Sequence, residues 1–211
     1  MLFLPIDVEY VIYAILLFAM MISGYLDDAS KTPWNEYKKG LIDLVISVVA
    51  VLTYMNFNST TICFGADEIV IPKALFLILG VILIWVSVNV TNCTDGVDGL
   101  CASLCSVTLL AFGVLFAPIL QKYAMANFLF LSVLFAYLYF NSSPSSMLMG
   151  DAGSRALGFY IAVIALKSTH PFIYILLAAV MIVDGGIGLV KIALKRFLKI
   201  SILKNFVSTN L

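Results

Sequence analysis

The sequence has few charged residues and almost no histidine. Only 11% of its 211 residues are charged, one residue is histidine and four are cysteine. The four cysteines lack a CxxC spacing and His170 stands alone, so the sequence disfavours a disulfide framework and a zinc site. The formal net charge is zero, which gives no reason to expect a nucleic-acid partner.

Apolar residues, by contrast, make up 63% of the chain. Soluble domains do not have this composition, and a membrane-spanning helix needs about 20 apolar residues, fewer where protein covers its ends. We therefore predict an all-α fold, a polytopic transmembrane helix bundle that forms one integral membrane domain over residues 1–211. Its seven predicted spans cover residues 9–26, 40–55, 74–91, 99–117, 123–140, 154–168 and 171–192.

Residues 89–100 form a polar stretch between two of these runs. Asp95 and Asp98 are three residues apart, so on a helical turn they would share a face. Acidic side chains beside hydrocarbon are costly and usually face a partner, a cation or a water-filled cavity. A polar loop between two membrane helices is the alternative interpretation.

Two further acidic clusters lie at the ends of apolar runs. Asp27 and Asp28 follow the first run, and Asp151 precedes the sixth within Gly-Asp-Ala-Gly-Ser. Each cluster has a structural alternative: the aspartate pair could be a solvated helix end, and Asp151 or Ser154 could cap the helix that starts there. A helix N-terminus also attracts phosphate, so capping and ligand binding are compatible.

Seven spans that alternate sides place all three acidic clusters on one membrane face. The same face collects nine of the twelve basic residues, and the opposite face holds Lys73, Lys122 and Lys167. By the positive-inside rule the acidic face is cytoplasmic.

The chemistry of these clusters favours a hard cation with oxygen ligands, Mg2+ before Zn2+. Mg2+ takes one or two carboxylates and keeps its other positions for phosphate and water. Lysine and arginine on the same face suit anionic phosphates. The residues therefore predict metal-assisted phosphoryl transfer at a membrane surface, with one reactant carried by a lipid.

Three motifs resemble those of a known family. They are Asp27-Asp28 after an apolar run, Asn89-x-x-Asn92-x-Thr94-Asp95-Gly96-x-Asp98-Gly99-Leu100, and Phe140-Asn141-x-x-Pro144 leading to Met149-Gly150-Asp151-x-Gly153-Ser154. Their order and spacing resemble the polyprenyl-phosphate N-acetylhexosamine-1-phosphate transferases and, within them, the bacterial phospho-N-acetylmuramoyl-pentapeptide transferases (MraY type). The resemblance runs from about residue 10 to the end of the chain.

The resemblance implies an enzyme that transfers phospho-N-acetylmuramoyl-pentapeptide from its UDP conjugate to undecaprenyl phosphate, giving lipid I and UMP in peptidoglycan synthesis. It implies Mg2+ as the cofactor, the two substrates and membrane lipid as partners, no nucleic acid, and the option of a homodimer. It also implies a multi-pass protein of the bacterial plasma (inner) membrane whose active site faces the cytoplasm.

The resemblance further implies roles for individual residues. Asp27, Asp28 and Asp151 would be catalytic, with Asp151 as the metal ligand and Asp28 as a candidate base. The residues implied to contact substrate are Lys39, Asn92, Asp95, Asp98 and Asn141, with Lys38 as an equal alternative to Lys39.

The chain departs from the family pattern in several places. Family members have ten spans, so about two are expected before residue 9 and one after Leu211, and we expect this chain to be the central portion of such an enzyme. The family's histidine-rich motif is absent from the sequence. Asp43 stands where many members have Gln, and Leu148 stands where many have the Phe that would stack on uracil.

Three other functions stay open. A UDP-N-acetylglucosamine-1-phosphate transferase is the nearest, although Thr94 before the acidic motif and the Phe-Asn-x-x-Pro lead favour the muramoyl enzymes. A cation transporter would need acids near mid-bilayer and an inverted repeat, whereas most acids here lie at span ends. A non-catalytic remnant that binds nucleotide or lipid is the third.

The sequence also predicts two features of the tertiary structure. The acids of the three clusters should converge on one cytoplasmic cleft. Asp184-Gly185-Gly186, an acid and two poor helix formers inside the seventh run, should bend that run so that its second half leaves the bundle.

Overall fold

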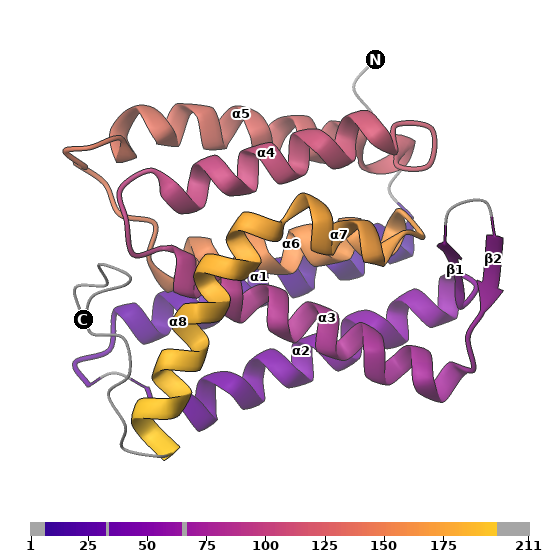
Figure 1. Cartoon of the computed structure of the whole chain (residues 1–211), viewed down its shortest axis with the longest axis horizontal. Helices are drawn as coiled ribbons and strands as arrows, with labels where there is room; N and C mark the ends of the chain where they lie inside the picture. Colours follow the sequence, from indigo (N-terminus) through magenta and orange to yellow (C-terminus); the bar gives the residue numbers. More distant parts are fainter. Residues whose placement is uncertain (1–6, 33, 65–66, 198–211) are drawn as a thin grey trace.

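The computed structural model describes residues 7–32, 34–64 and 67–197, with side chains as far as Lys191. Within these residues the chain is almost entirely helical and carries one short hairpin (Figure 1). The elements in chain order are α1 (Val8–Asp28), α2 (Glu36–Phe57), β1 (Thr61–Phe64), β2 (Asp67–Val70), α3 (Lys73–Thr94), α4 (Leu100–Leu115), the 3-10 helix η1 (Gln121–Tyr123), α5 (Ala124–Asn141), α6 (Gly150–Lys167), α7 (Pro171–Leu177) and α8 (Ala179–Phe197).

The helices have the character of a membrane protein. Within the described residues, α1, α2, α3 and the stretch Gln121–Asn141 are long and apolar enough to cross a membrane, and the bent pair of α7 and α8 would be a fifth span. α4 is apolar but has only 16 residues, and α6 carries charged side chains in its first and last turns. Each of the seven predicted runs contains one helix or the bent pair, so the all-α membrane bundle is confirmed.

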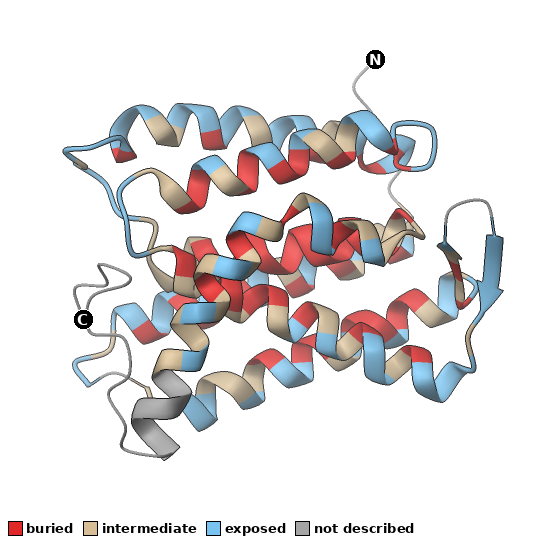
Figure 2. Cartoon of the chain, viewed as in Figure 1, coloured by how far each residue is buried: buried red, intermediate tan, exposed pale blue. Residues whose placement is uncertain are grey.

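α6 is the central helix of the bundle. Every residue from 154 to 166 is buried, so α6 is among the most buried parts of the chain (Figure 2). This buried stretch includes Arg155. α6 packs most closely on α3 and α1, and a Cβ on Gly158 would lie 2.8 Å from the Ser87 carbonyl oxygen of α3. The Ser87 hydroxyl donates to the Gly158 carbonyl oxygen at 2.8 Å. A helix buried on all sides must have its polar groups satisfied by its neighbours.

The far end of α6 is held by a part-buried ion pair. Lys167 Nζ lies 2.8 Å from Glu9 Oε1, near the start of α1, and donates at 2.8 Å to Asn58 Oδ1, just after α2. The Asn58 amide donates to Glu9 at 2.7 Å. Charge-assisted hydrogen bonds therefore join three helices at this end of the bundle.

The segment between α2 and α3 forms a short hairpin. β1 and β2 pair antiparallel, with Thr61 opposite Val70. The Cys63 backbone N–H donates to the Thr169 carbonyl oxygen at 2.9 Å, which ties the hairpin to the turn after α6. The hairpin thus lies at the end of the bundle opposite to the start of α2 (Figure 1).

The seventh apolar run is bent, but not where the sequence predicts. α7 and α8 meet at 82°, with Ala178 between them, and α8 continues as a helix through Asp184, Gly185 and Gly186. The prediction that these three residues break the run is wrong. A Cβ on Gly185 would lie 2.1 Å from the Val90 carbonyl oxygen, so the glycine lets α8 lie directly on α3. This packing outweighs the poor helix propensity of glycine, about 1 kcal/mol per residue.

Gly185→Ala should destabilise the protein, whereas Gly186→Ala should not. A methyl group at 185 would collide with the α3 backbone, and overpacking of this kind costs about 1–3 kcal/mol. No described atom lies within 4 Å of a Cβ at 186, and there the helix propensity of alanine should stabilise by up to about 1 kcal/mol. Thermal unfolding of both variants in one detergent measures the difference. Equal midpoints would mean that α8 does not rest on α3 at this glycine.

Candidate functional site

Three carboxylates meet where α1 ends and α6 begins. Asp27, Asp28 and Asp151 each offer one carboxylate oxygen, and these oxygens lie within 4.8 Å of one another. Asp27 is buried, Asp151 is half-buried and Asp28 is exposed. Asp27 and Asp28 therefore converge with Asp151, as the sequence predicts, although Asp151 lies far from them in the sequence.

Lys39, near the start of α2, supplies positive charge to this carboxylate cluster. Its Nζ forms ion pairs with Asp27 and with Asp151, the latter at 3.2 Å. The Trp34 backbone N–H donates to Asp27 at 2.8 Å, which fixes the loop between α1 and α2. Lys38 points elsewhere, with its Nζ 3.4 Å from the centre of the Trp34 ring. Of the two lysines that the sequence leaves open, Lys39 is the one at the cluster.

Asn92 reaches the cluster from the last turns of α3. Its side-chain amide donates to Asp151 Oδ1 at 2.8 Å and to Ser154 Oγ at 3.0 Å. Asp151 is thus held between Lys39 of α2 and Asn92 of α3. Four helices, α1, α2, α3 and α6, build one site.

The first turn of α6 lies beside acids from other helices. The backbone N–H groups of Asp151 and Ala152 face the Asp28 carboxylate, and the N–H of Gly150 faces the Asp95 carboxylate. Negative charge at a helix N-terminus is favourable, because it satisfies unpaired N–H groups and complements the helix dipole. The start of α6 is therefore joined to the ends of both α1 and α3.

Gly150 permits this close approach. Its φ is +67°, a conformation that L side chains rarely adopt, and a Cβ there would lie 2.6 Å from Asp28 Oδ2. Ser154 does not cap the helix, because its Oγ donates to the Gly150 carbonyl oxygen at 2.8 Å. Asp151 does not cap it either, because its oxygens accept from side chains of α2 and α3. The capping role that the sequence allows for these two residues is wrong.

Asp95, the residue after α3, has a shifted pKa. Burial raises the pKa of its carboxyl to about 6, and the nearby charges of Asp151 and Asp28 act in the same direction. The Gly150 N–H, which favours the ionised form, opposes the shift. A carboxyl with a strongly shifted pKa among other acids is typical of functional sites.

Asp98 and Asn141 connect the two loops that border the site. Asp98 Oδ2 accepts the Ser145 backbone N–H at 3.1 Å. Asn141 is buried, its Oδ1 accepts the Gly99 N–H at 2.9 Å, and its Nδ2 donates to the Met147 carbonyl oxygen at 2.7 Å. Both side chains hold the loop after α3 to the loop after α5. Within the described part of the chain, Asp98 lies at this junction rather than among the carboxylates that meet at α6.

One charged pair near the site is not found by sequence reasoning. Arg155 and Asp43 form an ion pair one helical turn below Asp151 and Lys39, and both are buried. A signal is present, because Asp43 lies four residues after Lys39, and Arg155 lies four residues after Asp151. Residues at this spacing share one face of a helix.

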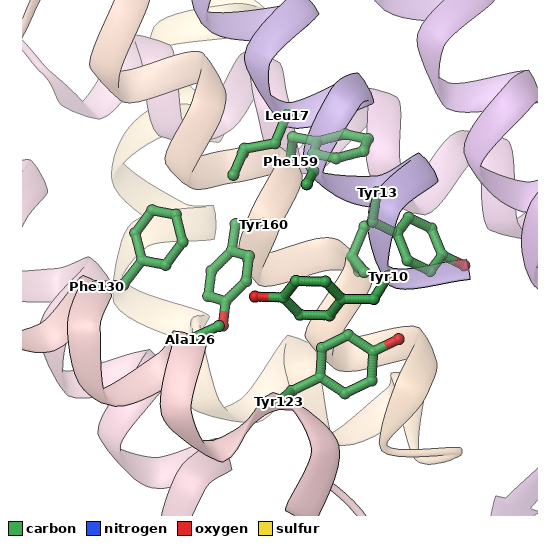
Figure 3. Close-up of a pocket in the computed structure, with 10 residues that line it drawn as sticks. Tyr10, Tyr13, Leu17, Tyr123, Ala126, Phe130, Phe159 and Tyr160 are labelled. Atoms are coloured by element: carbon green, nitrogen blue, oxygen red, sulfur yellow. The ribbon is translucent and has the colours of Figure 1, made fainter. Parts of the chain in front are cut away.

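A separate hollow lies between α1, α5 and α6, near the start of α1 (Figure 3). It has a volume of about 60 Å3, and Tyr10, Tyr13, Phe130 and Tyr160 are among its lining residues. The Tyr160 hydroxyl is buried and has no hydrogen-bond partner among the described residues. The lining residues carry no charge, so this hollow does not suit a phosphate.

The chain is similar to known proteins over most of its length. Residues 10–169 match the family model described as glycosyl transferase family 4. The chain is 37% identical to the phospho-N-acetylmuramoyl-pentapeptide-transferase of Treponema pallidum (strain Nichols), over 90% of this chain and 58% of that protein. It is 32% identical to the protein of the same name from Microcystis aeruginosa, over 74% of this chain and 46% of that protein. The chain thus spans about half the length of these curated relatives.

Asp95→Asn should change how stability depends on pH. The carboxyl has an ordinary pKa of 3.8 and a folded-state pKa of about 6, so between these values the folded protein binds more protons than the unfolded chain. The free energy of unfolding of the wild type should fall, relative to that of Asp95→Asn, as pH rises from about 4 to about 6, and the gap should be constant at higher pH.

Thermal unfolding in metal-free detergent solution over this pH series measures the gap. Asp67→Asn, on the exposed strand β2, is the control. A gap between wild type and Asp95→Asn that does not change with pH would contradict the shifted pKa.

Proposed function

The chain belongs to glycosyl transferase family 4, and from that premise we propose that it transfers phospho-N-acetylmuramoyl-pentapeptide from its UDP conjugate to undecaprenyl phosphate. The products of this step in peptidoglycan synthesis are lipid I and UMP. The names of the similar proteins support the identity of the transferred group. The observation that carries the proposal is the meeting of Asp27, Asp28 and Asp151 beside Lys39.

The proposed reaction is a phosphoryl transfer between two anions. An oxygen of the lipid phosphate attacks the sugar-linked phosphorus of the UDP conjugate, a new P–O bond forms, and the P–O bond to UMP breaks. In such transfers the protein performs little covalent chemistry, so catalysis comes mostly from substrate positioning and charge compensation. Acids that can hold a cation, with a lysine between them, suit both tasks.

We infer that Mg2+ binds at the carboxylate cluster. The three donors within 4.8 Å are hard carboxylate oxygens, and the described cluster contains neither histidine nor cysteine, which fits Mg2+ better than Zn2+. Asp151 would hold the ion, with Asp27 and Asp28 beside it. When bound, Mg2+ would neutralise the charge that develops on the leaving UMP.

Lys39 is the group proposed to contact phosphate. Its ammonium lies between two carboxylates, 3.2 Å from Asp151, so a phosphate oxygen beside Asp151 would meet its positive charge. Asp28 is the candidate base. A phosphate monoester with a second pKa of about 6 is already mostly ionised near pH 7, so this base would add little to the rate.

The nucleotide and diphosphate would bind at the loops after α3 and α5. Asn92, Asp95, Asp98 and Asn141 lie on or beside these loops, at the same end of the bundle as the carboxylate cluster. Because the hydrogen bonds of Asp98 and Asn141 join the two loops, these residues would shape the nucleotide site as well as contact it.

We propose that this end of the bundle faces the cytoplasm at a bacterial plasma membrane. The apolar helices support a membrane-embedded protein, and nine of the twelve basic residues fall on the predicted acidic side. A soluble UDP conjugate would then reach the carboxylates from water, while the phosphate of the lipid stays at the membrane surface.

A donor trial tests the transferred group. The purified protein in lipid nanodiscs receives undecaprenyl phosphate, Mg2+ and either UDP-N-acetylmuramoyl-pentapeptide or UDP-N-acetylglucosamine. A lipid-linked muramoyl-pentapeptide together with UMP is the expected result. A lipid-linked N-acetylglucosamine phosphate would assign the chain to the rival transferase, and no product from either donor would contradict both assignments.

Asp151→Asn should reduce transfer by at least about 100-fold, which corresponds to about 2.7 kcal/mol of lost transition-state stabilisation. The amide lacks the negative charge that holds Mg2+ against its reluctance to shed water. The fold should survive, because Lys39 keeps Asp27 as a partner, and the first turn of α6 keeps Asp28 and Asp95.

Turnover at excess Mg2+ and thermal unfolding are measured on the same sample of this variant. Asp67→Asn on the hairpin is the matched control, since it removes the same charge at the other end of the bundle. Near-normal turnover of Asp151→Asn would exclude this residue as the metal ligand and reassign the ion to Asp27 or Asp28.

A further inference from the structure

A buried ion pair lies directly beneath the carboxylate cluster. The Arg155 guanidinium of α6 pairs with the Asp43 carboxylate of α2, and their side chains are only 3% and 2% exposed. Asp43 lies four residues after Lys39, and Arg155 lies four residues after Asp151. Each is therefore about 6 Å farther along its helix, one turn below the ion pair of Lys39 with Asp151.

The two ion pairs form a ladder between α2 and α6. Both helices start at the acidic end of the bundle and run away from it, with Lys39 opposite Asp151 in the upper rung and Asp43 opposite Arg155 in the lower rung. The charges alternate along both helices. Each side chain of the upper rung therefore has an opposite charge across the ladder and another one turn below it, a spacing at which opposite charges attract.

Long side chains bridge the space between these two helices. α6 packs most closely on α1 and α3, and α2 packs on the same two helices. Asp43 also lies within the electrostatic reach of Lys39 and Asp151. The two ion pairs of the ladder thus join α2 to α6 at the height of the site.

Stability alone does not account for the lower rung. The Nη1 atom of Arg155 is buried and has no hydrogen-bond partner among the described residues. A buried ion pair carries a desolvation cost, and its replacement by apolar residues of similar volume is often neutral or stabilising. Breaking such a pair by removing one partner is strongly destabilising, so the two residues must be changed together.

We propose that Asp43 and Arg155 are positioning residues for the candidate site. They hold α2 and α6 in register, so that Lys39 stays bridged between Asp27 and Asp151 and the carboxylates keep their spacing. The side chains of both residues are buried below the carboxylate cluster, so they act on the site through Lys39 and Asp151. This role stands on the geometry, and only its effect on turnover rests on the proposed function.

Lysine labelling tests the proposal without any need for activity. The purified protein is treated with limiting acetic anhydride, and mass spectrometry gives the ratio of Lys39 to Lys38 acetylation. Lys38 is exposed and lies over Trp34, so it is an internal control on the neighbouring residue. In the wild type Lys39 should react more slowly than Lys38, because Asp27 and Asp151 hold its ammonium group.

The main variant is Asp43→Leu with Arg155→Met, which removes both charges and keeps apolar volume. We expect it to fold and to raise the Lys39 to Lys38 ratio at least about threefold, the size expected for neighbouring pairs that couple. Arg155→Lys, which keeps the charge, should leave the ratio close to that of the wild type. A folded apolar variant with the wild-type ratio would overturn the proposal.

A second neutral variant, Asp43→Asn with Arg155→Gln, takes the place of the first if the apolar pair does not fold. If neither neutral variant folds while Arg155→Lys does, the pair serves the fold itself and the proposal is overturned. In the folded variant the kcat for transfer should fall about tenfold with little change in the KM for the UDP conjugate. If the wild type shows no transfer, the proposed function fails, and the labelling ratio still decides the positioning role.

Discussion

The N-terminus of α6 is the constraint on which the rest of this site depends. α6 is buried along residues 154–166 and its first turn is half-buried, and the first backbone N–H groups of a helix have no partner within the helix. The carboxylates of Asp28, at the end of α1, and of Asp95, which follows α3, lie beside these groups. This arrangement brings two acidic helix ends to one point. Asp27 and Asn92, their neighbours in the sequence, arrive at the cluster with them.

So many acids in one place require positive charge nearby. Unpaired carboxylates in a low-dielectric setting are costly, and Lys39 compensates two of them directly. Arg155 places a second cation one turn deeper, with Asp43 as its partner. In the proposed function a bound Mg2+ would add to this arrangement at the surface of the bundle. At the far end of α6, the Glu9 carboxylate is likewise compensated by a positive charge, that of Lys167.

Much of the fold and part of the site were predictable from the sequence, because they depend on local composition. Long apolar runs predict membrane helices wherever they lie in the chain. Whether two helix ends share a membrane face depends on whether the number of spans between them is even or odd. That logic was enough to bring Asp27, Asp28 and Asp151 together. It could not choose between Lys38 and Lys39. Side chains of adjacent residues on one helix point in different directions, and the sequence does not show which direction faces the site. It also could not place Arg155, whose partner lies on a helix far away in the sequence.

By itself, then, the sequence determined an all-α membrane bundle with an acidic end, since hydropathy and span alternation need no knowledge of contacts. Only the tertiary structure decided that Asp28 and Asp95 lie at the start of α6, that Lys39 bridges the carboxylates, and that the last run bends at Ala178 instead of at its glycines. The physical reason is common to all three. Each depends on which backbone and side-chain groups from different helices touch, and such contacts override local propensity, as the fit of Gly185 against Val90 shows.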